Sequence, residues 1–191
     1  GKHEVQAMTD KGIFVVLKHF ALNDSEQDRI GLGVWLSEQA AREIYLKAFQ
    51  APVEEADAGL MVAYTRWGTI WSGGNHGLMT GIVREEWGKN GLIITDNVLT
   101  KYVNGVDGLM AGGVSCFDAM LPFVVNQLPK YENDPVIVTA MKEACHQNLY
   151  SVANSAAMNG VGEDTIVHAK ELDIIKTLRI SAIVVGAIFV G

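Results

Sequence analysis

Short apolar runs alternate with amphipathic stretches along the first two thirds of the chain. Residues 12–20, 58–65 and 91–97 are apolar runs that are too short for helices, and this pattern predicts buried strands. A weaker fourth strand is expected over residues 113–118. Strands that are apolar on both faces and alternate with helices are typical of parallel sheets. The pattern therefore predicts an α/β fold with a parallel sheet that is covered on both faces or closed into a barrel.

Three stretches between and after these strands predict helices. Residues 36–56 carry apolar positions on one face, and Pro52 is expected to kink or divide this helix. A second helix is expected over residues 78–88. A long third helix is expected over residues 134–160, because Asp134 is a suitable N-cap and a proline follows it at the first helical position.

Composition narrows the functional classes. The chain has 191 residues, 49% of them hydrophobic and 19% charged, which is typical of a folded domain. A net charge of -7 argues against a nucleic-acid surface, which needs clustered lysine and arginine. The sequence contains neither a dinucleotide fingerprint nor a P-loop, and its histidines and cysteines have no zinc-ligand spacing. We therefore expect no cofactor and no metal, and a neutral small molecule is the favoured ligand.

Polar residues stand at the ends of three of the predicted strands. Lys18 and His19 end the first, Tyr64 ends the second and Asp96 ends the third. The carboxyl ends of parallel strands meet at one edge of a sheet or one mouth of a barrel, so these side chains are expected to gather there. Together they offer several hydrogen bonds to a polyhydroxylated ligand, and a carboxylate suits an oxocarbenium-like centre. Asp96 alone would also be explained as the polar stop of a buried strand.

A second enzyme class is compatible with Lys18. A lysine at the end of a barrel strand can form a Schiff base when burial favours its neutral amine, as in a lyase. His19 and the nearby acidic residues Asp24 and Glu26 favour the charged ammonium instead, so this alternative is the weaker one.

Several motifs in fixed order resemble one known family. They are "KHFALND", "REIYLKAF", "VAYTRWG", "LMTGIVREEWG" and "IITD". In this order and spacing they resemble the later half of the catalytic barrel domain of glycoside hydrolase family 3, which includes many β-glucosidases. The resemblance implies about half of a TIM-type barrel of parallel β/α repeats, and it implies the retaining hydrolysis of a β-glucoside or oligosaccharide. A non-catalytic carbohydrate-binding or structural module with the same fold is the alternative.

The resemblance also implies roles for individual residues. Asp96 matches the family's nucleophile, which attacks the anomeric carbon. Lys18 and His19 are similar to ligands of the sugar hydroxyls, and Tyr64 resembles a residue that steadies the nucleophile by a hydrogen bond. Glu26 and Arg29, in the loop after the first strand, are interpreted as a structural ion pair, and a role as ligands is the alternative. Retaining hydrolysis needs a second carboxyl group, and no residue of this chain can be matched to it.

The resemblance divides the chain into three parts. Residues 1–160 are expected to form the partial barrel, residues 161–173 a linker, and residues 174–191 a hydrophobic tail that forms a C-terminal helix. The tail is interpreted either as a truncated membrane anchor or as a buried terminal segment of a cytoplasmic protein, since its apolar stretch is shorter than the roughly 20 residues of a membrane span. Because a half barrel is incomplete, we expect an inactive fragment that pairs with the rest of its parent enzyme or with itself.

Overall fold

The computed structural model describes residues 1–99, 102–118 and 128–166. Residues 1–159 form one compact unit. Residues 160–191 form a second, of which the structure describes only the turn-containing segment up to residue 166. The predicted hydrophobic tail, residues 174–191, lies outside the described residues. Among the helices that the structure describes, none is long and apolar enough to cross a membrane.

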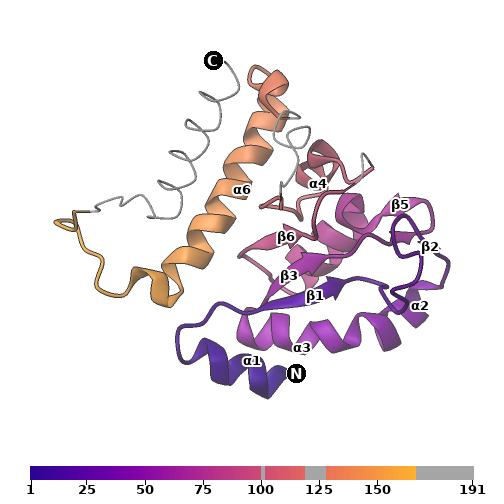
Figure 1. Cartoon of the computed structure of the whole chain (residues 1–191), viewed down its shortest axis with the longest axis horizontal. Helices are drawn as coiled ribbons and strands as arrows, with labels where there is room; N and C mark the ends of the chain where they lie inside the picture. Colours follow the sequence, from indigo (N-terminus) through magenta and orange to yellow (C-terminus); the bar gives the residue numbers. More distant parts are fainter. Residues whose placement is uncertain (100–101, 119–127, 167–191) are drawn as a thin grey trace, which may run out of the picture. The chain divides into compact units, whose positions relative to one another are not determined.

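A three-stranded parallel sheet forms the centre of the first unit (Figure 1). Its strands are β1 (Val16–Phe20), β3 (Gly59–Val62) and β6 (Ile93–Thr95), in the order β1-β3-β6. The three predicted strands and the parallel α/β fold are confirmed. The predicted fourth strand is reduced to a single parallel bridge between Ile94 and Cys116. The main chain of Cys116 nevertheless hydrogen-bonds to β6, on the side of β6 away from β3.

Helices and short strands connect and flank this sheet. In chain order the other elements are α1 (Lys2–Thr9), β2 (Gly33–Val34), α2 (Glu38–Ala40), η1 (Ala41–Tyr45), α3 (Lys47–Ala56), β4 (Arg66–Trp67), β5 (Ile70–Trp71), η2 (Ser72–Gly74), η3 (Gly77–Glu86), α4 (Gly105–Met110), η4 (Pro129–Tyr131), α6 (Pro135–Ala153) and η5 (Ala156–Met158). Strands β2, β4 and β5 form a second small sheet, in which β4 and β5 are an antiparallel hairpin.

The first predicted helix is divided, but not at Pro52. The break falls at Leu46, where the backbone N–H donates to the carbonyl of Ala41 (2.8 Å), the wider spacing of a π-helical turn. Helix α3 then continues through Pro52, which is itself buried with Val53 and Ala56. Packing of these three side chains holds the helix together across the proline.

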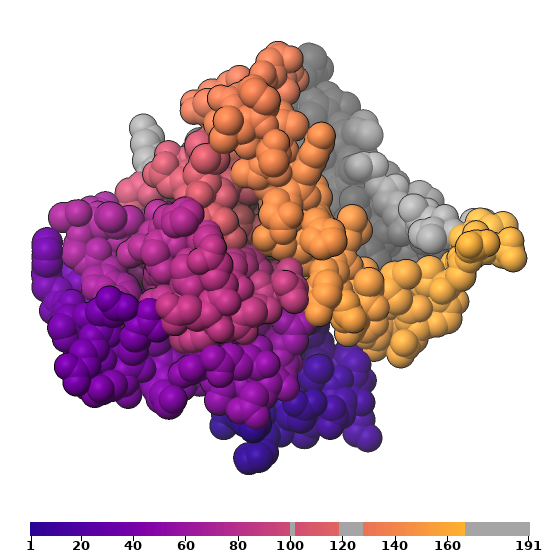
Figure 2. Space-filling view, turned by 180° about the vertical axis from the view of Figure 1, so that it is seen from behind, coloured from indigo at the N-terminus to yellow at the C-terminus, as the bar shows by residue number. Residues whose placement is uncertain are grey.

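The other two predicted helices are confirmed with shifted ends. Helix η3 covers the second prediction and also has π-type hydrogen bonds, such as that from Trp87 N–H to the Ile82 carbonyl (2.9 Å). Helix α6 begins as expected, because the Asp134 side chain accepts hydrogen bonds from the N–H groups of Val136 and Ile137. It ends earlier than predicted, at Ala153. Seen from behind, the magenta surface of η3 borders the orange surface of α6 (Figure 2).

The two faces of the main sheet are covered unequally. Leu60 and Ile93 stand in register on one face and are fully buried in the main core, against side chains of α3 and η3. The adjacent row on the other face holds Lys18, Met61 and Ile94, of which Lys18 is exposed and the other two are half-buried. One face of the sheet therefore carries the core, while the other is only partly covered.

Candidate active site

Asp96 lies directly after β6, the strand bonded on both sides. Its backbone N–H donates to the carbonyl of Val62 on β3 (3.2 Å), while the neighbouring Thr95 N–H donates to the carbonyl of Cys116 (3.1 Å). The side chain is largely buried, with the residue 9% exposed. The main chain therefore holds this carboxylate from both sides at the carboxyl end of the sheet.

Both carboxylate oxygens of Asp96 have partners. Oδ1 accepts a hydrogen bond from the backbone N–H of Asn97 (2.8 Å). Oδ2 lies 3.1 Å from Nη1 of Arg29 and 3.2 Å from Nε2 of His19. The guanidinium balances the negative charge, and the three contacts fix the plane of the carboxylate.

His19 reaches Asp96 through an irregularity in β1. Lys18 pairs with Met61 and Phe20 pairs with Val62, so His19 is an extra residue in the register. Such a bulge turns a side chain out of the regular alternation. Burial lowers the pKa of His19 and outweighs the opposing charge of Asp96, with Lys18 adding to the lowering. The neutral ring must therefore carry its proton on Nε2 for the contact with Asp96 to be a hydrogen bond.

Tyr64 stands beside the carboxylate without bonding to it. Its hydroxyl donates to the backbone carbonyl of Asn97, so the expected hydrogen bond to Asp96 is not formed. The carboxylate is held instead by Arg29 and His19 at Oδ2 and by the Asn97 N–H at Oδ1. Burial, followed by the charge of Asp96, raises the pKa of Tyr64 to about 12, which keeps the phenol a hydrogen-bond donor.

Lys18 is not brought to Asp96. Its side chain is exposed on the partly covered face of the sheet, and no hydrogen bond or ion pair joins it to another residue of the described segments. That position lacks the apolar surroundings that a Schiff-base lysine needs. The structure thus offers no support for the lyase alternative.

Arg29 has a contact with Asp96 that the sequence pattern did not predict. The predicted ion pair with Glu26 is present, with Nε 3.0 Å from Oε2. The other edge of the same guanidinium contacts Asp96, and it lies over the Tyr64 ring, 4.9 Å from its centroid. The available signal was its place in the loop that follows Lys18 and His19, because such loops surround the mouth of a parallel sheet.

The side chains around Asp96 are typical of a reactive carboxylate with its binding partners rather than of a metal centre. Within the described segments, no three histidine, cysteine or acidic side chains are grouped as metal ligands. Asp96, Arg29 and His19 instead form one polar cluster at the strand ends, with Tyr64 alongside. Such a cluster can present a carboxylate oxygen to an electrophilic carbon and hydrogen-bond to hydroxyl groups around it.

Residues 1–114 match the family model described as "Glycosyl hydrolase family 3 N terminal domain". Over 93 residues, or 48% of this chain, the sequence is 39% identical to an exo-α-(1→6)-L-arabinopyranosidase of Bifidobacterium longum. It is 41% identical to β-glucosidase A of Butyrivibrio fibrisolvens, also over 93 residues and 48% of the chain. These alignments cover 12% and 11% of the two relatives, so the chain matches only a small part of each.

Solved structures show the same arrangement of elements. A β-glucosidase of Bifidobacterium adolescentis superposes with a TM-score of 0.73 at 26% identity, covering 85% of this chain and 24% of that one. β-Glucosidase 3B of Thermotoga neapolitana, in complex with glycerol, gives a TM-score of 0.73 at 23% identity and covers 80% and 22%. The fold therefore matches part of each of these much longer chains.

Proposed function

The chain belongs to glycosyl hydrolase family 3, and we propose that it supplies one half of the active site of a retaining β-glycosidase. The observation that carries the proposal is the Asp96 carboxylate, which is held at the carboxyl end of β6 by Arg29, His19 and a backbone N–H. The place of this cluster supports the same role, because reactive groups of parallel-sheet enzymes gather at the carboxyl ends of the strands.

In the proposed reaction Asp96 is the nucleophile. One carboxylate oxygen attacks the anomeric carbon, the bond to the leaving-group oxygen breaks, and that oxygen takes a proton from an acid. Water then attacks the same carbon and releases the sugar, with its proton passing to the conjugate base of that acid. Arg29 orients the carboxylate before attack, and Tyr64 fixes the adjacent loop by bonding to the carbonyl of Asn97.

His19 and Lys18 are proposed as ligands of the sugar hydroxyls. His19 is fixed beside Asp96, and its second ring nitrogen can accept a hydrogen bond from a hydroxyl. Lys18 points to the open face of the sheet, so it would contact a sugar only when the ligand or another part of the enzyme closes over that face.

We further propose that the acid and the missing strands come from outside this chain. This rests on the resemblance of the chain to the later half of a parallel barrel, and on β1, whose outer edge is unpaired in the described sheet. The rest of the parent enzyme is the proposed partner, and self-association through this edge and the open face is the alternative. The chain alone is accordingly expected to be inactive.

The substrate is proposed to be a β-glucoside. This rests on the names of several relatives, whereas the name of the Bifidobacterium longum relative specifies an L-arabinopyranoside. A panel of aryl glycosides, given to the complete parent enzyme, would separate these sugars. No turnover of any of them would favour the non-catalytic carbohydrate-binding module.

The test of the nucleophile is covalent trapping in the complete parent enzyme. A 2-fluoro-β-glucoside should add one sugar mass to the peptide that contains Asp96, and Asp96→Asn should abolish both this adduct and turnover. The matched control is Asp24→Asn, which removes an exposed carboxylate from the loop after β1 and should keep the adduct. An adduct that persists in Asp96→Asn would show that another residue is the nucleophile.

A further inference from the structure

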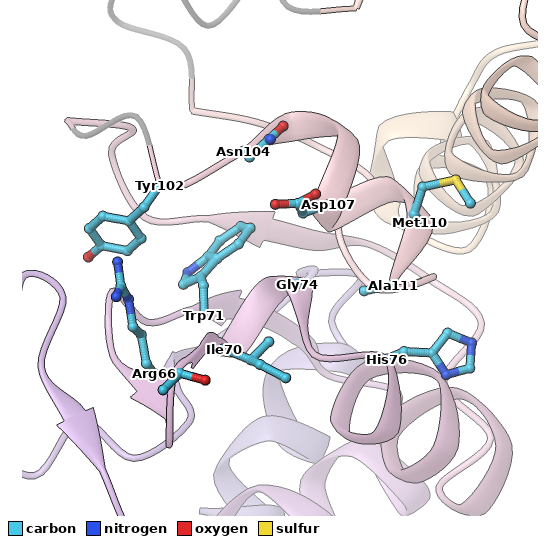
Figure 3. A pocket seen from close by; sticks show the side chains of 11 residues that line it. Arg66, Ile70, Trp71, Gly74, His76, Tyr102, Asn104, Asp107, Met110 and Ala111 are labelled. Atoms are coloured by element: carbon cyan, nitrogen blue, oxygen red, sulfur yellow. The ribbon is translucent and has the colours of Figure 1, made fainter.

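A pocket whose lining includes neither Tyr64 nor Asp96 is shown in Figure 3. It has a volume of about 500 Å³, within the range of small-molecule sites. The β4–β5 hairpin, η2 and α4 form its walls. None of the Asp96, Arg29 or His19 side chains lines it, so it is distinct from the proposed catalytic centre.

One wall of the pocket carries a fixed cation. The guanidinium of Arg66 lies over the ring of Tyr102, 4.5 Å from its centroid, and Arg66 is half-buried. The Tyr102 hydroxyl in turn donates to the backbone carbonyl of Tyr64 (2.9 Å). This stack holds a planar set of hydrogen-bond donors at the pocket wall.

The opposite wall carries a carboxylate above an aromatic floor. In Figure 3 Asp107 of α4 points toward the space over the Trp71 indole, with Arg66 on the far side of that ring. Trp71 cannot turn away easily, because its Nε1–H donates to the carbonyl of Ala63 (2.9 Å) and the residue is buried. No hydrogen bond joins the Asp107 side chain to another of the residues that the structure describes, and Asp107 is exposed.

The charges of the lining select the class of ligand. The opposite charges of Arg66 and Asp107 offset each other, so the lining favours neither an anion nor a cation, and a neutral hydroxyl group can accept from the first and donate to the second. Ile70 and Trp71 add apolar surface against which the face of a ring can pack. We propose that this pocket binds a neutral, hydroxyl-bearing ring compound of the size of one or two sugar rings, independently of the Asp96 centre.

The test uses the whole 191-residue chain and two probes, methyl β-D-glucopyranoside and cellobiose. Binding is followed by the indole N–H signal of Trp71 in NMR titrations, with Trp71→Phe identifying that signal. Removing the acceptor in Asp107→Ala should weaken binding about fivefold or more, the loss expected for one hydrogen bond. Ile70→Ser should also weaken it, because it removes exposed apolar surface from the pocket.

Two control variants separate the pocket from the catalytic proposal. Asp24→Ala removes an exposed carboxylate outside the pocket, and Asp96→Asn alters the other site; both should leave the Trp71 titration unchanged. Glucose 6-phosphate and glucosamine, which carry opposite charges, should bind more weakly than the neutral probes. A Trp71 signal that does not move at saturating sugar, or one that responds to Asp96→Asn and not to Asp107→Ala, would overturn the proposal.

Discussion

Replacing Arg84 by methionine should destabilise the chain far more than replacing any exposed arginine. Arg84 belongs to η3 and is half-buried, with its guanidinium bonded to α6, and burial lowers the pKa of this group to about 10, so it is still charged at neutral pH. Its acceptors are the backbone carbonyls of Lys89 (2.9 Å), Gly91 (2.7 Å), Gly112 (3.0 Å) and Gly113 (2.8 Å), and Oε1 of Gln147 (2.7 Å). One side chain thus joins the segment before β6, the turn after α4 and helix α6.

The expected cost follows from those contacts. Methionine fills similar space but leaves several buried carbonyl groups without a donor, and removing one side of a buried charged network typically costs about 3–5 kcal/mol. A domain of this kind has a total stability of about 5–15 kcal/mol, so the loss is a large part of it. With a urea slope of about 1–3 kcal/mol/M, the unfolding midpoint should fall by more than about 1 M.

Arg42→Met is the matched control. Arg42 makes ion pairs with Glu38 (2.8 Å) and Glu86 (2.6 Å), but both carboxylates are well exposed and the Arg42 side chain is 36% exposed. Exposed pairs of this kind contribute about 0–1 kcal/mol, so the urea midpoint should move little. Equal shifts for the two variants would refute the reasoning, because burial and not the number of hydrogen bonds is argued to set the difference.

Three further predictions concern other contacts. Because the pKa of His19 is lowered in the folded chain, the unfolded chain binds a proton at His19 more readily, and the free energy of unfolding should fall as the pH drops below 6.5. Urea titrations at several pH values should show a smaller fall for His19→Gln. Tyr64→Phe keeps the ring under Arg29 but removes the donor to Asn97, and thermal unfolding should show a loss of about 0.5–1.5 kcal/mol. Asp134→Ala removes the N-cap of α6 and should cost about 1 kcal/mol, whereas Asp134→Ser should restore most of it.

The order of the elements could be predicted because each one carries its own local pattern. The strands β1, β3 and β6 are continuous apolar runs, and the start of α6 has a capping aspartate followed by proline. The break at Leu46 could not be predicted, because a π-type turn depends on how the helix packs and leaves no residue signature like that of proline. The predicted break at Pro52 is wrong because packing also decides here: α3 continues through the proline, and its neighbours Val53 and Ala56 are buried.

The location of the site could be predicted from the sequence, but most contacts between its side chains could not. Strand ends put His19, Tyr64 and Asp96 at one edge, and the structure brings all three together. Sequence spacing could not show that Arg29 reaches across to Asp96, nor that Tyr64 bonds to the Asn97 carbonyl. Those outcomes depend on which donor reaches the carboxylate, and that is decided by the path of a loop.

The position of β6 between two neighbours has a consequence for local motion. To move Asp96 away from its partners, the chain must break the bond from Asp96 N–H to Val62 on one side and that from Thr95 N–H to Cys116 on the other. Opening of this strand therefore requires much of the unit to unfold, and these two amides should be among the slowest of the described residues to exchange with deuterium. The carboxylate is thus fixed by cooperative stability, while the loop that carries Arg29 can open at much lower cost in free energy.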